Sequence, residues 1–129
     1  MTIFTKIING EIPCYKIAES THFFAFLDIF PLQKGHTLVV PKIEVDKIFD
    51  LPDDYLKELL IFSKPIAKAI ESVIDCKRVS FVTVGLEVPH AHVHLIPIND
   101  SNDINFANTK LKFTDTELLA IQELIVAEL

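Results

Sequence analysis

The chain has 129 residues, half of them hydrophobic, and a formal net charge of −6. This length predicts one domain over residues 1–129, and the hydrophobic content suffices for a core without disulfides or metals. The acidic balance argues against a nucleic-acid partner, because a general nucleic-acid binder needs a basic surface to neutralise phosphates.

The N-terminal segment and the cysteines bear on where the protein resides. Residues 1–13 lack the long apolar core of a signal peptide, and charges or prolines interrupt every hydrophobic run before it reaches the length of a membrane span. The two cysteines, Cys14 and Cys76, lie far apart in no metal-ligand spacing, which is typical of reduced thiols in the cytosol. We therefore expect a cytoplasmic protein with no membrane partner.

The beginning of the chain is predicted to form a short helix followed by strands. Residues 2–9 carry Phe4 and Ile7 on one side and precede Gly10, a residue that commonly ends helices. Strand-like runs follow at residues 15–19, 22–27 and 36–41. The phenylalanines of the second run suit a pleated, half-buried surface.

The middle of the chain changes to a helical period and then returns to strands. Apolar residues recur every three or four positions over residues 52–74, although Pro65 lacks an N–H and is expected to kink or interrupt this helix. Residues 79–84 and 92–97 are predicted to form two strands joined by a short turn around Gly85.

The end of the chain predicts one more helix. Thr114 and Glu117 form a capping box, which opens a helix that we expect to continue through Glu128. Strands, a long helix, a hairpin and a last helix together predict an α+β domain with a mainly antiparallel sheet.

The most informative segment is the run of alternating histidines in residues 89–97, Pro-His-Ala-His-Val-His-Leu-Ile-Pro. Side chains alternate faces along a strand, so His90, His92 and His94 should project from one face, each about 6.6 Å from the next. The Ala, Val and Leu between them can then enter the core. His36, which opens another strand-like run, could lie beside the three histidines on a paired strand.

Three interpretations of this cluster compete. A solvated polar face would be the natural reading of one histidine, but it fits three in strict alternation less well. A zinc site is possible because histidines at i and i+2 can both reach one ion, although Glu87 is the only carboxylate close by in the sequence. The third interpretation is imidazole chemistry on an anionic substrate, since imidazole titrates near pH ~6.5. Spacing alone leaves metal ligand and nucleophile open.

The segment His-Ala-His-Val-His-Leu-Ile resembles the signature of the histidine-triad (HIT) superfamily. Residues 3–13, 26–31 and 35–42 resemble, in order, the N-terminal helix and turn of the family, the end of its ribose-binding strand, and the strand that follows. The resemblance covers residues 3 to 97. It implies a HIT-like α+β fold with a five-stranded antiparallel sheet, a long helix and a C-terminal helix.

The resemblance also implies a role for each site residue. His92 would attack the α-phosphorus of a nucleotide, with one ring nitrogen held by the backbone carbonyl of His90. His94 and His36 would contact phosphate oxygens or the leaving group, and Asp28 would accept hydrogen bonds from the ribose hydroxyls. The base pocket would be walled by Ile3, Phe4, Ile7, Phe26, Leu27 and Ile29.

Two departures from the family pattern refine this expectation. The phosphate-contacting loop of the family normally holds an Asn and a small hydroxyl residue, whereas residues 82–89 are shorter and place Glu87 there. A carboxylate repels phosphate, so Glu87 is interpreted as recognising a cationic or amine leaving group. The Cys and His ligands of structural zinc in some bacterial members are replaced by Thr5 and Glu44, so we expect no metal and no other cofactor.

The sequence therefore predicts a hydrolase that cleaves a purine nucleoside phosphoramidate or a dinucleoside polyphosphate at the α-phosphate through a nucleotidyl-histidine intermediate. A third histidine, His94, favours hydrolysis, because the transferase branches of the superfamily tend to carry glutamine there. The rival predictions are a nucleotide sensor or partner-binding module with little turnover, and a metal-dependent hydrolase. Surplus apolar residues on helix 52–74, including Ile61 and Phe62, predict a homodimer.

Overall fold

The computed structural model describes residues 1–129 and confirms the α+β fold with a five-stranded antiparallel sheet. The strands lie in the order β1-β2-β3-β5-β4, and each pairs antiparallel with its neighbour. The elements are α1 (Ile3–Ile8), β1 (Lys16–Glu19), β2 (Phe23–Leu27), β3 (Thr37–Pro41), α2 (Asp53–Val73), β4 (Arg78–Val82), β5 (Val93–Ile98) and α3 (Asp115–Val126). None of these helices is long and apolar enough to cross a bilayer.

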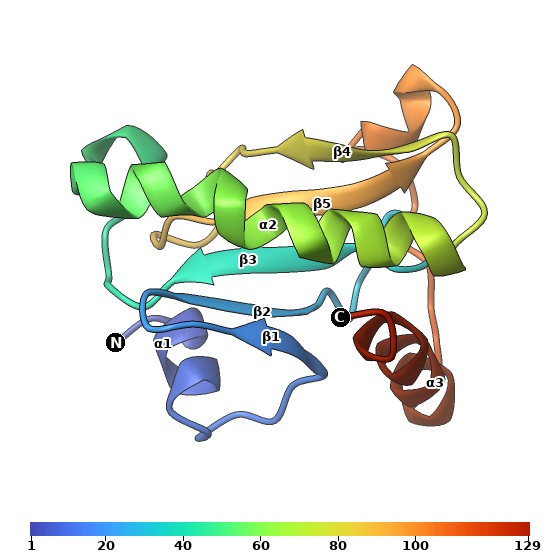
Figure 1. Ribbon diagram of the computed structural model, residues 1–129, viewed down its shortest axis with the longest axis horizontal. Coiled ribbons are helices and arrows are strands. Elements are labelled where there is room, and N and C mark those ends of the chain that lie inside the picture. The colour runs from blue at the N-terminus through green and yellow to red at the C-terminus, as the bar shows by residue number, and fades with distance from the viewer.

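Helices cover both faces of the sheet. Strand β2 is buried along its whole length, and its side chains divide between two apolar clusters. Phe23, Ala25 and Leu27 join the larger core under α2 and α3, while Phe24 and Phe26 join a smaller cluster with residues of α1. Figure 1 shows α2 crossing the sheet on the face that carries the larger core. The strand alternation thus gives each face its own core.

The interruption that was one of the two effects expected of Pro65 does not occur, because α2 continues from Asp53 to Val73. Proline leaves the carbonyl four residues earlier, here that of Ile61, without its helical N–H partner. Both Pro65 and Ile61 are exposed. The carbonyl can therefore bond to water, and the helix tolerates the proline.

The expected short turn around Gly85 is also wrong. Residues 83–92 separate β4 from β5, and β5 begins at Val93, so His90 and His92 precede the strand. Gly85 does adopt a left-handed backbone conformation, with φ of 73°. The capping box of Thr114 and Glu117 is confirmed, and α3 ends at Val126, two residues before the expected end.

Candidate active site

The alternating histidines form a continuous row of packed rings with two neighbours from distant parts of the chain. The ring of His92 lies 5.0 Å from that of His94 and 5.0 Å from that of Phe4, between centroids. His94 continues the row to His36 at 5.1 Å, and Phe4 also contacts His90 at 5.5 Å. All four histidines are buried. The predicted convergence of the triad with His36 is therefore found in the structure.

The strand register explains this convergence. Strand β5 pairs antiparallel with β3, which sets His94 opposite Leu38 and leaves His36 just before the start of β3. Leu38 belongs to the cluster on the α1 face, so His94 projects from that face too. Val93 and Leu95, which flank His94 in the sequence, enter the core under α2.

The hydrogen bond of His92 fixes its tautomer. Its Nδ1 lies 2.7 Å from the backbone carbonyl oxygen of His90, which can only accept, so Nδ1 carries the proton. The lone pair is then on Nε2, which makes no hydrogen bond within the protein. Burial lowers the pKa of His92, so the ring is neutral and nucleophilic near pH 7.

A second set of hydrogen bonds orders His36 and His94. The Leu32 backbone N–H donates to His36 Nδ1 over 3.0 Å, so the proton of this ring lies on Nε2. His36 Nε2 donates in turn to His94 Nδ1 over 2.9 Å, which leaves the proton of His94 on Nε2. Burial lowers the pKa of His36 to about 3 and that of His94 to about 4. The Leu32 amide thus fixes the tautomers of two neutral rings, His36 and His94. His94 is left with an N–H donor at Nε2.

His90 serves a different purpose, because both of its ring nitrogens are bound within the protein. Nε2 lies 2.8 Å from the backbone carbonyl oxygen of Pro41, so it donates there. Nδ1 accepts from the Thr2 hydroxyl at 2.7 Å. With no free ring nitrogen, His90 contributes its backbone carbonyl to the site.

A cavity of about 330 Å³ opens beside this row of rings. Five of the residues expected at the site line it, namely Asp28, His36, Glu87, His92 and His94. Glu87 thus lines the same cavity as the histidines, with an exposed side chain. The remaining lining residues are Phe30, Val84, Gly85, Leu86, Phe106 and Lys110.

Asp28 lies at the edge of the cavity with a perturbed carboxyl group. One oxygen accepts from the Phe30 backbone N–H at 2.9 Å, and the other lies 3.6 Å from His36 Nε2. Burial raises the pKa of Asp28 to about 6, against the opposing effects of the Phe30 hydrogen bond and of Lys110. The carboxylate therefore forms near neutral pH and can then accept hydrogen bonds from a ligand.

Asp28, His36 and His94 also bring three candidate metal-ligand atoms within 4.8 Å of one another. The hydrogen bonds of these residues are incompatible with metal binding. A histidine binds a metal ion through a ring nitrogen that carries no proton. His36 Nε2 holds the proton that it donates to His94, since Nδ1 already accepts from Leu32. A metal here would require that pattern to be rebuilt.

The apolar residues expected around the base divide into three groups. Phe4, Ile7 and Phe26 are buried together on the α1 face, where Phe4 contacts His92. Leu27 lies on the opposite face of the sheet, in the core with Val39, because the strand alternation turns it away. Ile3 and Ile29 are half exposed, so they can contribute only to a rim.

Sequence reasoning did not identify two residues that the structure places beside His94. The ring of Phe106 lies 4.8 Å from that of His94, edge to face. Lys110 holds this segment in place, donating from Nζ to the backbone carbonyls of Phe106 at 2.6 Å and Asn108 at 3.4 Å. The segment has no periodicity, and a single phenylalanine in a polar stretch was the only signal available. Lys110 is the one cation that lines the cavity.

Comparison with known proteins identifies the family to which this chain belongs. The HIT domain matches residues 9–101 of the chain. The chain belongs to the HIT family. It is 41% identical over 122 residues to an uncharacterised HIT-like protein of Methanocaldococcus jannaschii, covering 85% of this chain and 90% of the relative.

Two further relatives extend the comparison within the HIT family. The adenosine 5'-monophosphoramidase HNT1 of Saccharomyces cerevisiae is 39% identical over 99 residues, which cover 76% of this chain and 63% of the yeast protein. The crystal structure of a HIT-like protein involved in cell-cycle regulation from Bartonella henselae superimposes with a TM-score of 0.86. It is 27% identical, and the match covers 99% of this chain and 96% of that one.

Proposed function

We propose that this HIT protein hydrolyses a purine nucleoside phosphoramidate or a related nucleotide through a covalent nucleotidyl intermediate on His92. Membership of the HIT family and the phosphoramidase relatives support nucleotide hydrolysis in general. The observation that carries the specific proposal is the hydrogen bond from His92 Nδ1 to the His90 carbonyl, which leaves Nε2 as a lone-pair nucleophile at the cavity.

The reaction has two steps. His92 Nε2 attacks the α-phosphorus, forming an N–P bond while the bond from phosphorus to the leaving nitrogen or oxygen breaks, and the leaving group takes a proton from solvent. Water then attacks the same phosphorus, the N–P bond breaks, the proton of the water returns to solvent, and the lone pair of His92 is restored. The His94 Nε2–H donates a hydrogen bond to a phosphate oxygen as charge develops.

The other groups of the cavity suit the two ends of such a substrate. Asp28 would accept from the ribose hydroxyls, and the base would lie toward Phe4, Ile7 and Phe26, which are buried next to His92 and do not line the cavity. Lys110 would face phosphate or another anionic group, and Glu87 would face a cationic or amine leaving group. Opposite charges in one cavity favour a leaving group that carries its own positive charge.

Mass spectrometry tests the covalent step. The protein is mixed with adenosine 5'-phosphoramidate and quenched in alkaline denaturant, because the N–P bond to histidine hydrolyses in acid, and peptide mapping at alkaline pH locates any adduct. We expect an adenylyl group on the peptide that contains His92. The matched control is His92→Asn, because the amide of Asn can still donate to the His90 carbonyl but has no ring nucleophile. A wild-type protein that binds the nucleotide but gives neither an adduct nor AMP would favour the sensor instead.

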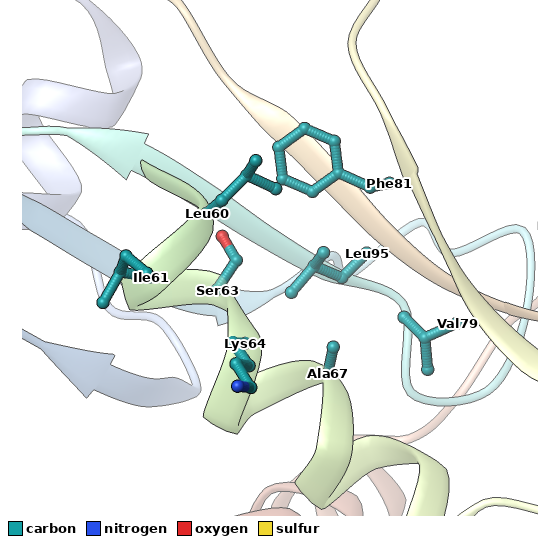
Figure 2. Close-up of a pocket in the computed structure, with 8 residues that line it drawn as sticks. All are labelled: Leu60, Ile61, Ser63, Lys64, Ala67, Val79, Phe81 and Leu95. Atoms are coloured by element: carbon teal, nitrogen blue, oxygen red, sulfur yellow. The ribbon is translucent and has the colours of Figure 1, made fainter. Parts of the chain in front are cut away.

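We also propose that the protein is a homodimer whose partner covers the groove in Figure 2. This groove of about 340 Å³ lies between α2 and the outer strand β4, and its lining residues include Ile61, Phe81 and Leu95. Leu60 and Ile61 are 62% and 71% exposed, although each is an apolar side chain on a long helix. Strand β4 has no neighbour on its outer side. A second copy related by a two-fold axis would bury the groove and pair the two β4 edges.

A further inference from the structure

Three polar side chains that do not line the cavity, two at the start of α1 and one at residue 44, form a hydrogen-bonded network that reaches His90. The Glu44 carboxylate accepts from the Thr5 hydroxyl at 2.6 Å and from the Thr2 backbone N–H at 2.7 Å. The Thr2 hydroxyl accepts from the Thr5 backbone N–H at 3.1 Å and lies 2.7 Å from His90 Nδ1.

The chemistry of the groups in this network determines which of them donates and which accepts in each hydrogen bond. The proton of the Thr5 hydroxyl is directed to Glu44, which as a carboxylate can only accept. His90 Nε2 donates to the Pro41 carbonyl, so Nδ1 has a lone pair and the Thr2 hydroxyl must donate to it. The Thr5 hydroxyl lowers the pKa of Glu44, which keeps this group ionised at neutral pH.

We propose that Thr2, Thr5 and Glu44 are positioning residues for catalysis, because they hold His90 and, through the His90 carbonyl, direct the lone pair of His92. The path runs from Glu44 through Thr5 and Thr2 to the His90 ring, and the carbonyl of the same residue binds His92 Nδ1 at 2.7 Å. This inference rests on the proposed nucleophilic role of His92.

The two bonds of the Thr2 hydroxyl serve different purposes. By accepting from Thr5 N–H it caps α1, a structural role that other N-cap residues can fill. By donating to His90 it supplies the only hydrogen bond that Nδ1 of this fully buried ring receives. A substitution that keeps the first bond and removes the second isolates the positioning role.

Three variants of Thr2 separate these roles. Thr2→Ser keeps both bonds, Thr2→Val loses both, and Thr2→Asp keeps the helix cap but offers His90 an acceptor in place of a donor. We expect Thr2→Asp to protonate His90 Nδ1, so that His90 becomes a buried imidazolium beside His92. The matched control is Thr114→Asp, the same exchange at the N-cap of α3, which lies outside the site.

The readouts are the imidazole ¹⁵N–¹H spectra and the pH dependence of kcat and KM for adenosine 5'-phosphoramidate. For Thr2→Asp we expect two protonated nitrogens on His90, a kcat about tenfold lower or more, and a KM within about twofold of wild type. Thr2→Ser and Thr114→Asp should behave as wild type. If Thr2→Asp leaves both the His90 spectrum and kcat unchanged, the positioning role is wrong. A wild-type protein without turnover contradicts the proposed function instead, and the spectra still test the network.

Discussion

At the scale of single residues, the electrostatics of the cavity rest on Asp28 more than on the histidines. Burial lowers the pKa of His36 to about 3 and that of His94 to about 4, so these two rings stay neutral through mild acid, and burial also lowers the pKa of His92. Burial raises the pKa of Asp28 to about 6, so this carboxyl group takes up a proton as the pH falls from neutral through about 6, before His36 or His94 does.

We therefore expect the acid limb of kcat/KM to have its midpoint near pH 6, because protonated Asp28 loses an acceptor for the ribose. The measurement is kcat/KM for adenosine 5'-phosphoramidate from pH 4 to pH 8. Asp28→Asn should lower kcat/KM at neutral pH by roughly tenfold and remove this limb. A limb that persists unchanged in Asp28→Asn would assign the titration to another group.

The charge of Glu87 should weaken binding of polyanions. We expect Glu87→Ser to lower KM for a dinucleoside polyphosphate by roughly threefold to tenfold, a modest gain because the side chain is exposed and screened. KM for an amine phosphoramidate should rise, since its leaving group would lose a carboxylate partner. The control is Glu123→Ser, an exposed glutamate on α3. Equal kinetics of Glu87→Ser and wild type on both substrates would place Glu87 outside the leaving-group site.

At the scale of elements, the sequence was most informative where periodicity and burial agree. The buried strands β2, β3 and β5 and the capped helix α3 lie within a few residues of their predicted bounds. The alternation in residues 90–94 correctly placed three histidine rings on one side, although only His94 lies within β5. The alternation of side chains along an extended chain was enough to predict which face the rings share. The first residue of β5 depends instead on where its pairing with β4 stops, which the local sequence does not show.

The features that the sequence did not predict depend on contacts between distant segments. Phe106 and Lys110 reach the cavity from a loop whose path no local pattern encodes. Leu27 was expected beside the base because the family segment contains it, yet its neighbour Phe26 already occupies that face. The Thr2–His90 bond joins residues 88 positions apart, which periodicity cannot reveal.

The loop between β2 and β3 offers a test of how tightly this framework holds His36. Gly35 has φ of 91°, and a Cβ placed there would lie 3.0 Å from a side-chain carbon of Ile74. Gly10 has φ of 79° but open space around its Cβ position. Each Gly→Ala change should lower the free energy of unfolding by about 1 kcal/mol, because alanine disfavours the left-handed backbone. Gly35→Ala adds crowding against Ile74, at the residue that directly precedes His36.

We therefore expect Gly35→Ala to lower the free energy of unfolding more than Gly10→Ala and, unlike it, to lower kcat. Urea unfolding and steady-state kinetics on both variants provide the comparison. Equal losses of stability would mean that Ile74 moves aside without disturbing the loop.

At the scale of the whole molecule, the exposed apolar groove predicts self-association. Sedimentation at micromolar concentration should give twice the chain mass of 14.6 kDa. Ile61→Lys, which places a charge in the groove, should shift the protein to the monomer, because a buried unpaired charge weakens association. Leu124→Lys, at a similarly exposed apolar position on α3, is the control and should remain dimeric. A wild-type monomer at this concentration would contradict the dimer.

The two edges of the sheet differ, and this difference limits how many copies can join. Helix α3 packs beside β1 at one edge, where the Gln122 side chain donates to the Lys16 carbonyl at 2.8 Å. The other edge, β4, is open. A sheet with two open edges can add copies without end and grow into a fibre, whereas a single open edge is occupied once two copies pair edge to edge. In the proposed dimer, the helix at the end of the chain would therefore keep the assembly at two copies.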